Sequence, residues 1–168
     1  MATIDPTPVV SDAGPLIHLD QLNCLDLLRD LGRVLIPREV WKEALKHRPQ
    51  LDLSRLPAAH VVDVTGEPSA RLLALIVSLG LDAGEMAALL LVEGVSARLF
   101  LCDDAAARLA AESLGFTVRG TIGLLIRSIR ATTRTMKWNS LRAPSVLNRE
   151  RRACRTSCGE RCSCLAAN

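Results

Sequence analysis

Acidic side chains stand at four separated places in the first 130 residues of this chain, where their surroundings suit metal chemistry. Asp12 directly follows an apolar run, and the adjacent residues Asp103 and Asp104 directly follow another. Glu43 and Glu85 lie in segments of helical character between these two points. Carboxylate oxygens are the ligands that hard divalent cations such as Mg²⁺ and Mn²⁺ prefer. The four places are therefore candidates for one metal site.

The reaction that such a site would support is the hydrolysis of a phosphodiester bond. Metal ions held by carboxylates activate a water molecule and stabilise the charge on the attacked phosphate and on the leaving oxygen. Carboxylates that are clustered without a metal repel one another. We therefore expect some of their pKa values to be raised in the metal-free protein.

Each acid also has a purely structural interpretation. Asp12 could cap the helix that follows it. Asp82 and Glu85 have the spacing of a capping box, in which two residues satisfy each other's backbone N–H groups at the start of a helix. Glu43 stands among other charged residues and could belong to a solvated helix face, and one of the two adjacent aspartates must cap a helix. Each acid taken alone therefore has another explanation, and only the four places taken together indicate a metal site.

The elements that must position these acids alternate between strand and helix. Strands are predicted at residues 8–11, 34–36, 60–64, 98–102 and 116–118, and helical segments at 15–31, 37–45, 68–79, 81–93, 103–114 and 120–130. A break near Asn23 is expected within the first of these helical segments. This alternation predicts an α/β fold with a mainly parallel sheet. Ligands of such sheets bind beyond the carboxyl ends of the strands, which is where Asp12 and the Asp103–Asp104 pair stand.

Composition separates a globular part from a tail. The chain is 49% hydrophobic but only 2% aromatic, which predicts an aliphatic core and argues against a protein that stacks nucleic-acid bases on aromatic side chains. Residues 1–130 contain 13 basic and 16 acidic residues, whereas residues 131–168 contain 8 and 2. No signal peptide is recognisable and the apolar runs are too short to span a bilayer, so we expect no membrane contact and a cytoplasmic protein.

The tail has no apolar periodicity and is rich in Arg, Ser and Cys. We expect one domain over residues 1–130 and a basic, poorly ordered or atypical tail over residues 131–168, with a shifted reading frame or a remodelled end as the preferred hypothesis. Cys154, Cys158, Cys162 and Cys164 lack the paired Cys-x2-Cys spacing of a zinc ribbon. Cys24 and Cys102 stand in apolar surroundings, and we expect small buried thiols there.

Five blocks around the acids resemble the PIN-domain family, in order along the chain. They are VVSDAGPLIHL at residues 9–19, IPREVWKEAL at 36–45, DAGEMAA at 82–88, LCDDAAAR at 101–108 and GFTVRGTIGLL at 115–125. The resemblance covers about residues 8–130. It is narrowest to a bacterial and archaeal branch that is labelled a domain of unknown function.

The resemblance implies a fold and an activity. The fold would be a three-layer sandwich whose central parallel sheet has the strand order 3-2-1-4-5, flanked by helices. The activity would be that of a ribonuclease that cleaves RNA with Mg²⁺ or Mn²⁺. The resemblance further implies the toxin of a toxin–antitoxin pair of the VapC type. Members of the family often form homodimers and are inhibited by a small antitoxin protein, so a homodimer and an antitoxin partner are expected.

The resemblance also assigns roles to the acids. Asp12, Glu85 and one of the adjacent aspartates would bind the metal, and Glu43 would be a further ligand, directly or through water. Successive residues that leave a strand point to opposite sides, so only one of Asp103 and Asp104 should reach the metal. We favour Asp103 as the ligand and Asp104 as the helix cap, and keep both as candidates.

Two polar residues stand in the sequence blocks given above. Ser11 and Thr121 are candidate polar neighbours of the site, although local bonding to the backbone would explain them equally well. The main alternative function is a PIN fold without catalysis that binds nucleic acid or protein. A phosphatase with an Asp nucleophile is disfavoured because it would need a second Asp two residues after Asp12, where Gly14 stands.

Overall fold

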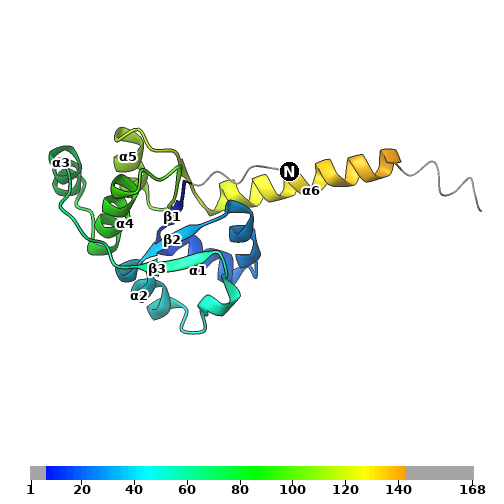
Figure 1. Cartoon of the computed structure of the whole chain (residues 1–168), viewed down its shortest axis with the longest axis horizontal. Coiled ribbons are helices and arrows are strands. Elements are labelled where there is room, and N and C mark those ends of the chain that lie inside the picture. Colours follow the sequence, from blue (N-terminus) through cyan, green and yellow to red (C-terminus); the bar gives the residue numbers. More distant parts are fainter. Residues whose placement is uncertain (1–6, 143–168) are drawn as a thin grey trace, which may run out of the picture. The chain divides into compact units, whose positions relative to one another are not determined.

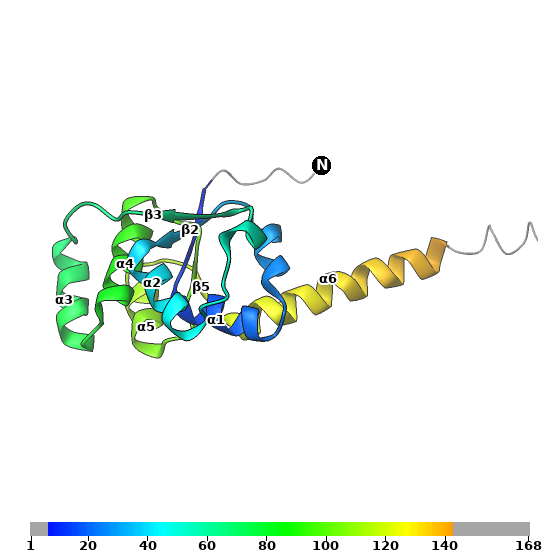
Figure 2. The same ribbon diagram turned by 90° about the horizontal axis from the view of Figure 1, so that it is seen from below.

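Five short strands form one parallel sheet in this structure, a computed structural model that describes residues 7–142, with side chains through residue 131. The strands are β1 (Val9–Ser11), β2 (Val34–Pro37), β3 (Ala59–Val62), β4 (Leu99–Leu101) and β5 (Val118–Arg119). Their order is β3-β2-β1-β4-β5, and every neighbouring pair is parallel. The strand order that the family resemblance implied is confirmed. Figure 2 shows β3 along one edge of the sheet with β2 beside it.

Helices connect the strands and cover the sheet. They are α1 (Ala13–Gln21), α2 (Arg38–His47), α3 (Ala70–Leu79), α4 (Ala83–Gly94), α5 (Ala105–Ser113) and α6 (Thr121–Arg142), with 3₁₀ helices η1 (Leu25–Leu31) and η2 (Leu53–Arg55). Figure 1 shows α3, α4 and α5 grouped together, and α4 also packs against α2. The helical segment predicted at 15–31 is divided where Asn23 adopts a positive φ of 53°.

The chain divides into two units between Ile126 and Arg127, and the sheet belongs to the first. Helix α6 was predicted to end near residue 130, but it continues to Arg142. The sequence there lacks an apolar stripe, yet it contains neither Gly nor Pro and includes several good helix formers, which is sufficient for a helix. The four cysteines of the tail lie outside the described residues, and the division into domain and tail stays a prediction.

The three central strands of the sheet, β1, β2 and β4, are buried on both faces. The two valines of β1 and Val34 and Ile36 of β2 have no exposed surface, and neither has Phe100 of β4. Parallel strands covered on both faces are expected to be continuously apolar, as these are. Apart from Phe100, the fully buried large side chains are aliphatic, as the composition predicted.

The carboxyl ends of β1 and β4 are adjacent, and this positions the acids. Ser11 of β1 pairs with Leu101 of β4, and the backbone N–H of Asp12 donates to the carbonyl oxygen of Leu101 at 2.8 Å. Asp12 and Cys102 are therefore each one residue beyond the last pair of these strands. A side chain at Gly14 would place its Cβ 3.3 Å from the Cβ of Asp103, so the first turn of α1 packs closely against the end of β4.

Candidate active site

Asp12 is a buried carboxylate without a cationic partner. Only 7% of its surface is exposed, and within the described residues no Lys, Arg or His forms an ion pair with it. Burial raises its pKa to about 6, with contributions from the charges of Glu43 and Asp82. Asp20 is buried as well, but its carboxylate lies 2.8 Å from the guanidinium Nε of Arg48. Among the described residues, the burial of Asp12 is thus not compensated by an ion pair.

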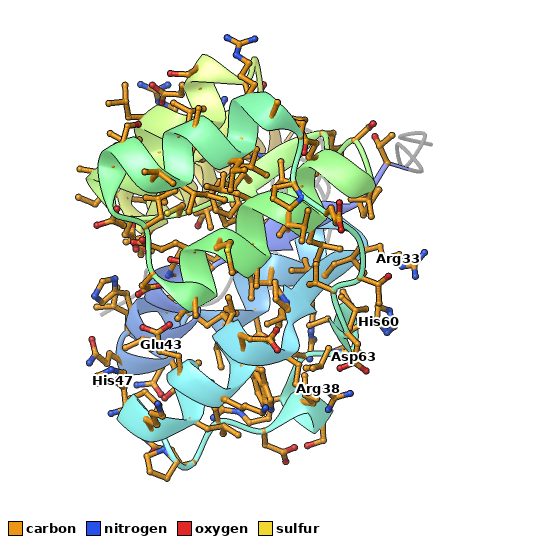
Figure 3. All side chains as sticks on the ribbon, turned by 90° about the vertical axis from the view of Figure 1, so that its left-hand side faces the viewer. Arg33, Arg38, Glu43, His47, His60 and Asp63 are labelled. Carbon is orange, nitrogen blue, oxygen red and sulfur yellow. The ribbon has the colours of Figure 1, made fainter. Side chains whose placement is uncertain are left out.

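Glu43 reaches toward Asp12 from α2, next to the first turn of α4. A side chain at Gly84 would place its Cβ 2.9 Å from Glu43 Oε2, so this position must lack a side chain for the carboxylate to lie there. Figure 3 shows Glu43 and His47 on the same side of α2, away from Arg38. An open pocket of about 520 Å³ runs along this side, lined by Glu39, Lys42, Glu43, Lys46, His47, Asp82, Ala83 and Gly84.

Glu85 forms the capping box that its spacing from Asp82 predicted, and it also lies beside other acids. It forms a capping box at the start of α4, in which its Oε2 accepts from the N–H of Asp82 at 2.9 Å and its own N–H donates to Asp82 Oδ1 at 2.8 Å. Burial raises the pKa of Glu85 to about 7, assisted by the charges of Asp82 and Asp104 and a hydrogen bond between the Glu85 and Asp104 carboxyl groups. The cap therefore does not exclude a role in the site.

Asp104, rather than Asp103, lies beside Glu85. Its Oδ1 caps α5 by accepting from the N–H groups of Ala106 at 2.7 Å and Ala107 at 2.9 Å. These bonds, that from Ala107 foremost, and the hydrogen bond with Glu85 lower the pKa of Asp104. The same aspartate is thus the helix cap that the sequence analysis expected and the nearer neighbour of the other acids.

Asp103 points to the opposite side, toward α1 and α6. Its Oδ1 accepts from the N–H of Thr121 at 2.8 Å, and its Oδ2 accepts from the Thr121 hydroxyl at 2.6 Å and lies 3.0 Å from Nδ1 of His18. Partial burial works to raise the pKa of Asp103, but these hydrogen bonds bring it below its ordinary value. The structure therefore does not bring the favoured ligand Asp103 together with the other acids, because adjacent residues at the end of a strand point in opposite directions.

The two candidate polar neighbours differ. The Ser11 hydroxyl is buried and donates to the carbonyl oxygen of Asp12 at 3.0 Å, which is the local backbone bond that was the alternative for this residue. Thr121 is buried and binds Asp103 with both its N–H and its hydroxyl group.

Three further residues lie at or beside the site without having been expected there from the sequence: Asp82, Cys102 and His18. Cys102 is buried, as expected, but its surroundings are not purely apolar, since its thiol lies 3.7 Å from Asp12 Oδ2. Burial raises the pKa of this thiol, so it stays protonated and donates. Asp82 contributes charge beside Asp12, and His18 contacts Asp103. The place of Cys102 beside the acids could have been predicted from the sequence. It stands two residues before Asp104, and residues two apart in an extended chain point to the same side.

Asp12, Glu43, Asp82, Glu85 and Asp104 form what we call the acidic group. The atoms with which this group could bind a metal are all carboxylate oxygens, which suits Mg²⁺ or Mn²⁺. Within the described residues, no three His, Cys, Asp or Glu side chains are arranged to hold a metal ion as they stand. The helix caps and the hydrogen bond between Glu85 and Asp104 engage carboxylate oxygens that a metal ion would use. The chemistry of the group, a set of carboxylates without a cationic partner at Asp12 among the described residues, fits a divalent cation.

A five-stranded parallel sheet with this order and acids at its carboxyl edge defines an α/β domain of the kind found in nucleases. The chain belongs to the PIN-domain family, whose sequence pattern it matches over residues 8–136. PIN domains are generally nucleases. No curated protein matches the sequence. In the part of the chain that the structure describes, no helix has the length and apolarity that crossing a membrane requires.

Among solved structures, the chain is similar to the crystal structure of PAE2754 from Pyrobaculum aerophilum. The two share 15% sequence identity with a TM-score of 0.49, over 76% of this chain and 97% of that chain.

Proposed function

We propose that this PIN domain is an endoribonuclease that hydrolyses RNA phosphodiester bonds with bound Mg²⁺ or Mn²⁺ at the acidic group. The observation that carries the proposal is the state of Asp12, which is buried among other carboxylates with a pKa of about 6 and has no cationic partner within the described residues. Burying an uncompensated charge is unfavourable, and a bound divalent cation is the usual way in which proteins compensate several carboxylates together.

The protein's own residues would divide the work. Asp12, Glu85 and Asp104 would bind the metal, and Glu43 would bind it directly or through water. A metal bound there supplies an activated water and charge stabilisation for the attacked phosphate. The Cys102 thiol holds Asp12 in place, and the capping bonds fix Glu85 and Asp104 at the starts of their helices.

Basic side chains beside the acidic group would help a polyanion to approach it. Lys46 and His47 lie one helical turn beyond Glu43 and line the same pocket. Neither forms an ion pair within the described residues, whereas the arginines at the two ends of α2 are both paired with aspartates. The ammonium group of Lys46 and the ring N–H of His47 are therefore available for contacts with RNA phosphates, which provide affinity without reading sequence.

Metal binding is expected to strengthen as the pH rises. Asp12 and Glu85, with pKa values of about 6 and about 7, hold protons in the acidic range that a metal must displace. The apparent affinity for Mn²⁺ should therefore rise by about a hundredfold between pH 5.5 and pH 8 and then level off. Calorimetric titration in buffers of different ionisation enthalpy measures both the affinity and the protons released. Affinity that does not change with pH would show that these acids are not the ligands.

Cleavage of single-stranded RNA tests the function directly. We expect cleavage in millimolar Mn²⁺ or Mg²⁺, its loss on addition of EDTA, and its return when excess metal is added. Cleavage that survives chelation would contradict a metal mechanism. Neither cleavage nor divalent binding at millimolar concentration would favour the alternative, a PIN fold that binds nucleic acid or protein without catalysis.

The family resemblance alone leads to two finer proposals. The protein would be the toxin of a toxin–antitoxin pair, inhibited by a small protein partner, and it would form a homodimer. A neighbouring small gene whose product co-purifies with this chain and suppresses its RNA cleavage would support the first. Light scattering of the purified chain would test the second.

A further inference from the structure

A second pocket of about 520 Å³ opens on the side of β4 to which Asp103 points. It lies between the end of α1 and the start of α6, within the first unit of the chain. Its lining residues are His18, Gln21, Leu22, Asp103, Thr121, Ile122 and Leu125. Its volume is in the range of pockets that bind small organic groups.

The walls of this pocket suit an uncharged group with an apolar face. Leu22 is 53% exposed and Ile122 is 72% exposed, so both present aliphatic surface to solvent. No Lys or Arg is among the lining residues, in contrast to the pocket beside α2. A phosphate or an acidic peptide would find little here to neutralise its charge.

The rim of the pocket offers oriented hydrogen-bonding groups. Asp103 is held by Thr121 and in turn accepts from Nδ1 of His18, which fixes the ring and keeps a proton on that nitrogen. The other nitrogen, Nε2, is then an acceptor in the neutral ring. The Gln21 amide has both a donor and an acceptor, and within the described residues it has no hydrogen-bonding partner. Such a mixture matches the edge of a nucleobase.

This pocket adjoins the acidic group at the end of β4. Asp103, which lines the pocket, is adjacent in the chain to Asp104 of the acidic group, and it packs against Gly14 two residues after Asp12. Because Asp103 and Asp104 are consecutive residues, the pocket and the acidic group adjoin at the end of β4, and a base would have to extend only across this strand end to enter the pocket from a phosphate at the acidic group.

We propose that this pocket binds one nucleobase of a single-stranded RNA, so that it selects which phosphodiester bond is presented to the acidic group. The proposal rests on the ribonuclease function proposed above. The base would pack on the aliphatic side chains of Leu22 and Ile122, as bases do on apolar pocket walls, and its edge would bond to His18 and Gln21. A single strand is required because the edges of paired bases are occupied.

Short RNA oligomers that carry an abasic nucleotide at successive positions test the proposal. With the native protein in Mn²⁺, we expect one position near the cut at which base removal lowers kcat/KM by about tenfold. In Ile122→Ala and in Gln21→Ala, the intact oligomer should already be cleaved several-fold more slowly, and base removal at that position should add less than about twofold. Val77→Ala, an equally exposed apolar residue on α3 outside the pocket, is the matched control and should behave as the native protein.

Three outcomes would overturn the proposal. The first is an abasic effect that is equally large in Ile122→Ala, Gln21→Ala and the native protein. The second is the absence of any position that responds to base removal. The third is a loss of self-association in Ile122→Ala, measured by light scattering, while the abasic effect persists, because the pocket would then be a protein interface.

The test remains decisive if the native protein cleaves no RNA, an outcome that would refute the proposed function by itself. Fluorescence anisotropy of the same labelled oligomers then replaces kinetics. Tighter binding of the intact than of the abasic oligomer by the native protein, lost in Ile122→Ala and kept in Val77→Ala, would support the base pocket. No such difference would refute it.

Discussion

Replacement of Asp12 by Asn is expected to abolish RNA cleavage and to stabilise the metal-free protein. As the most buried member of the acidic group, Asp12 should be indispensable for metal binding, and we expect cleavage to fall by about a thousandfold or more. Asn keeps the shape of the side chain and removes its charge. Cleavage assays in Mn²⁺ measure the first effect, and full activity of Asp12→Asn would refute the proposed function.

The effect on stability follows from the raised pKa of Asp12. Its value of about 6 in the folded protein exceeds the ordinary value of 3.8, so the folded state binds this proton more tightly than the unfolded state. In the native protein the free energy of unfolding should therefore decrease as the pH rises from about 4 to about 6 and stay lower above that. Asp12→Asn lacks this decrease, and at pH 8 in EDTA it should be more stable by roughly 2 kcal/mol.

Asp20→Asn is the matched control for this stability prediction. Asp20 is as deeply buried as Asp12, but Arg48 compensates its charge at 2.8 Å. Removing that charge leaves the guanidinium without its partner, so the free energy of unfolding should fall by about 2–3 kcal/mol. Urea denaturation at pH 4 and pH 8 measures both variants. Destabilisation of both would mean that Asp12 is not an uncompensated charge.

Replacement of Asp104 and of Asp103 by Asn should have very different effects on metal binding. Asp104 lies beside Glu85, so Asp104→Asn should weaken Mn²⁺ binding and lower cleavage by about a hundredfold. Asp103 is directed to Thr121 and His18, so Asp103→Asn should reduce Mn²⁺ affinity by less than about tenfold. Calorimetric titration with Mn²⁺ measures both affinities.

The two substitutions are matched because both preserve a helix cap. The side-chain oxygen of Asn can still accept from the N–H groups at the start of α5, and equally from that of Thr121 at the start of α6. Thermal denaturation of both variants should therefore change little. If Asp103→Asn lost the metal and Asp104→Asn retained it, the ligand would be Asp103, as the sequence analysis favoured.

The fold was largely predictable from local patterns. Short apolar runs alternating with segments of helical spacing predicted the five strands and the α-helices between them, because burial of the central strands on both faces requires continuous apolar residues. The short 3₁₀ helix η2 was not predicted, since the segment around it has the composition of a loop. The division of the first helical region near Asn23 was also visible in the sequence. The length of α6 was not, because a helix whose residues have good propensity needs no apolar stripe to persist.

The positions of the acidic residues in the chain were predictable from the sequence, whereas the contacts between their side chains were not. Asp12 and the adjacent aspartates were placed at the carboxyl edge of the sheet by the strands that precede them. The proximity of Glu43 to Asp12 depends on how α2 packs against α4, where the absence of a side chain at Gly84 leaves room for the Glu43 carboxylate. No local pattern in the sequence reports a contact between two helices that are 40 residues apart.

The chain by itself determined which residue types stand at the ends of the strands, and therefore that acids gather at one edge of a parallel sheet. Only the tertiary structure decided which adjacent aspartate joins them. Alternation along the strand predicts that the side chains of Asp103 and Asp104 point in opposite directions. Which of the two points toward Asp12 depends on the register between β1 and β4. Pairing of Ser11 with Leu101 brings Asp12 level with Cys102, and Asp104 shares the side of Cys102. Register is a property of two strands together, so it is set by the packing of the whole sheet.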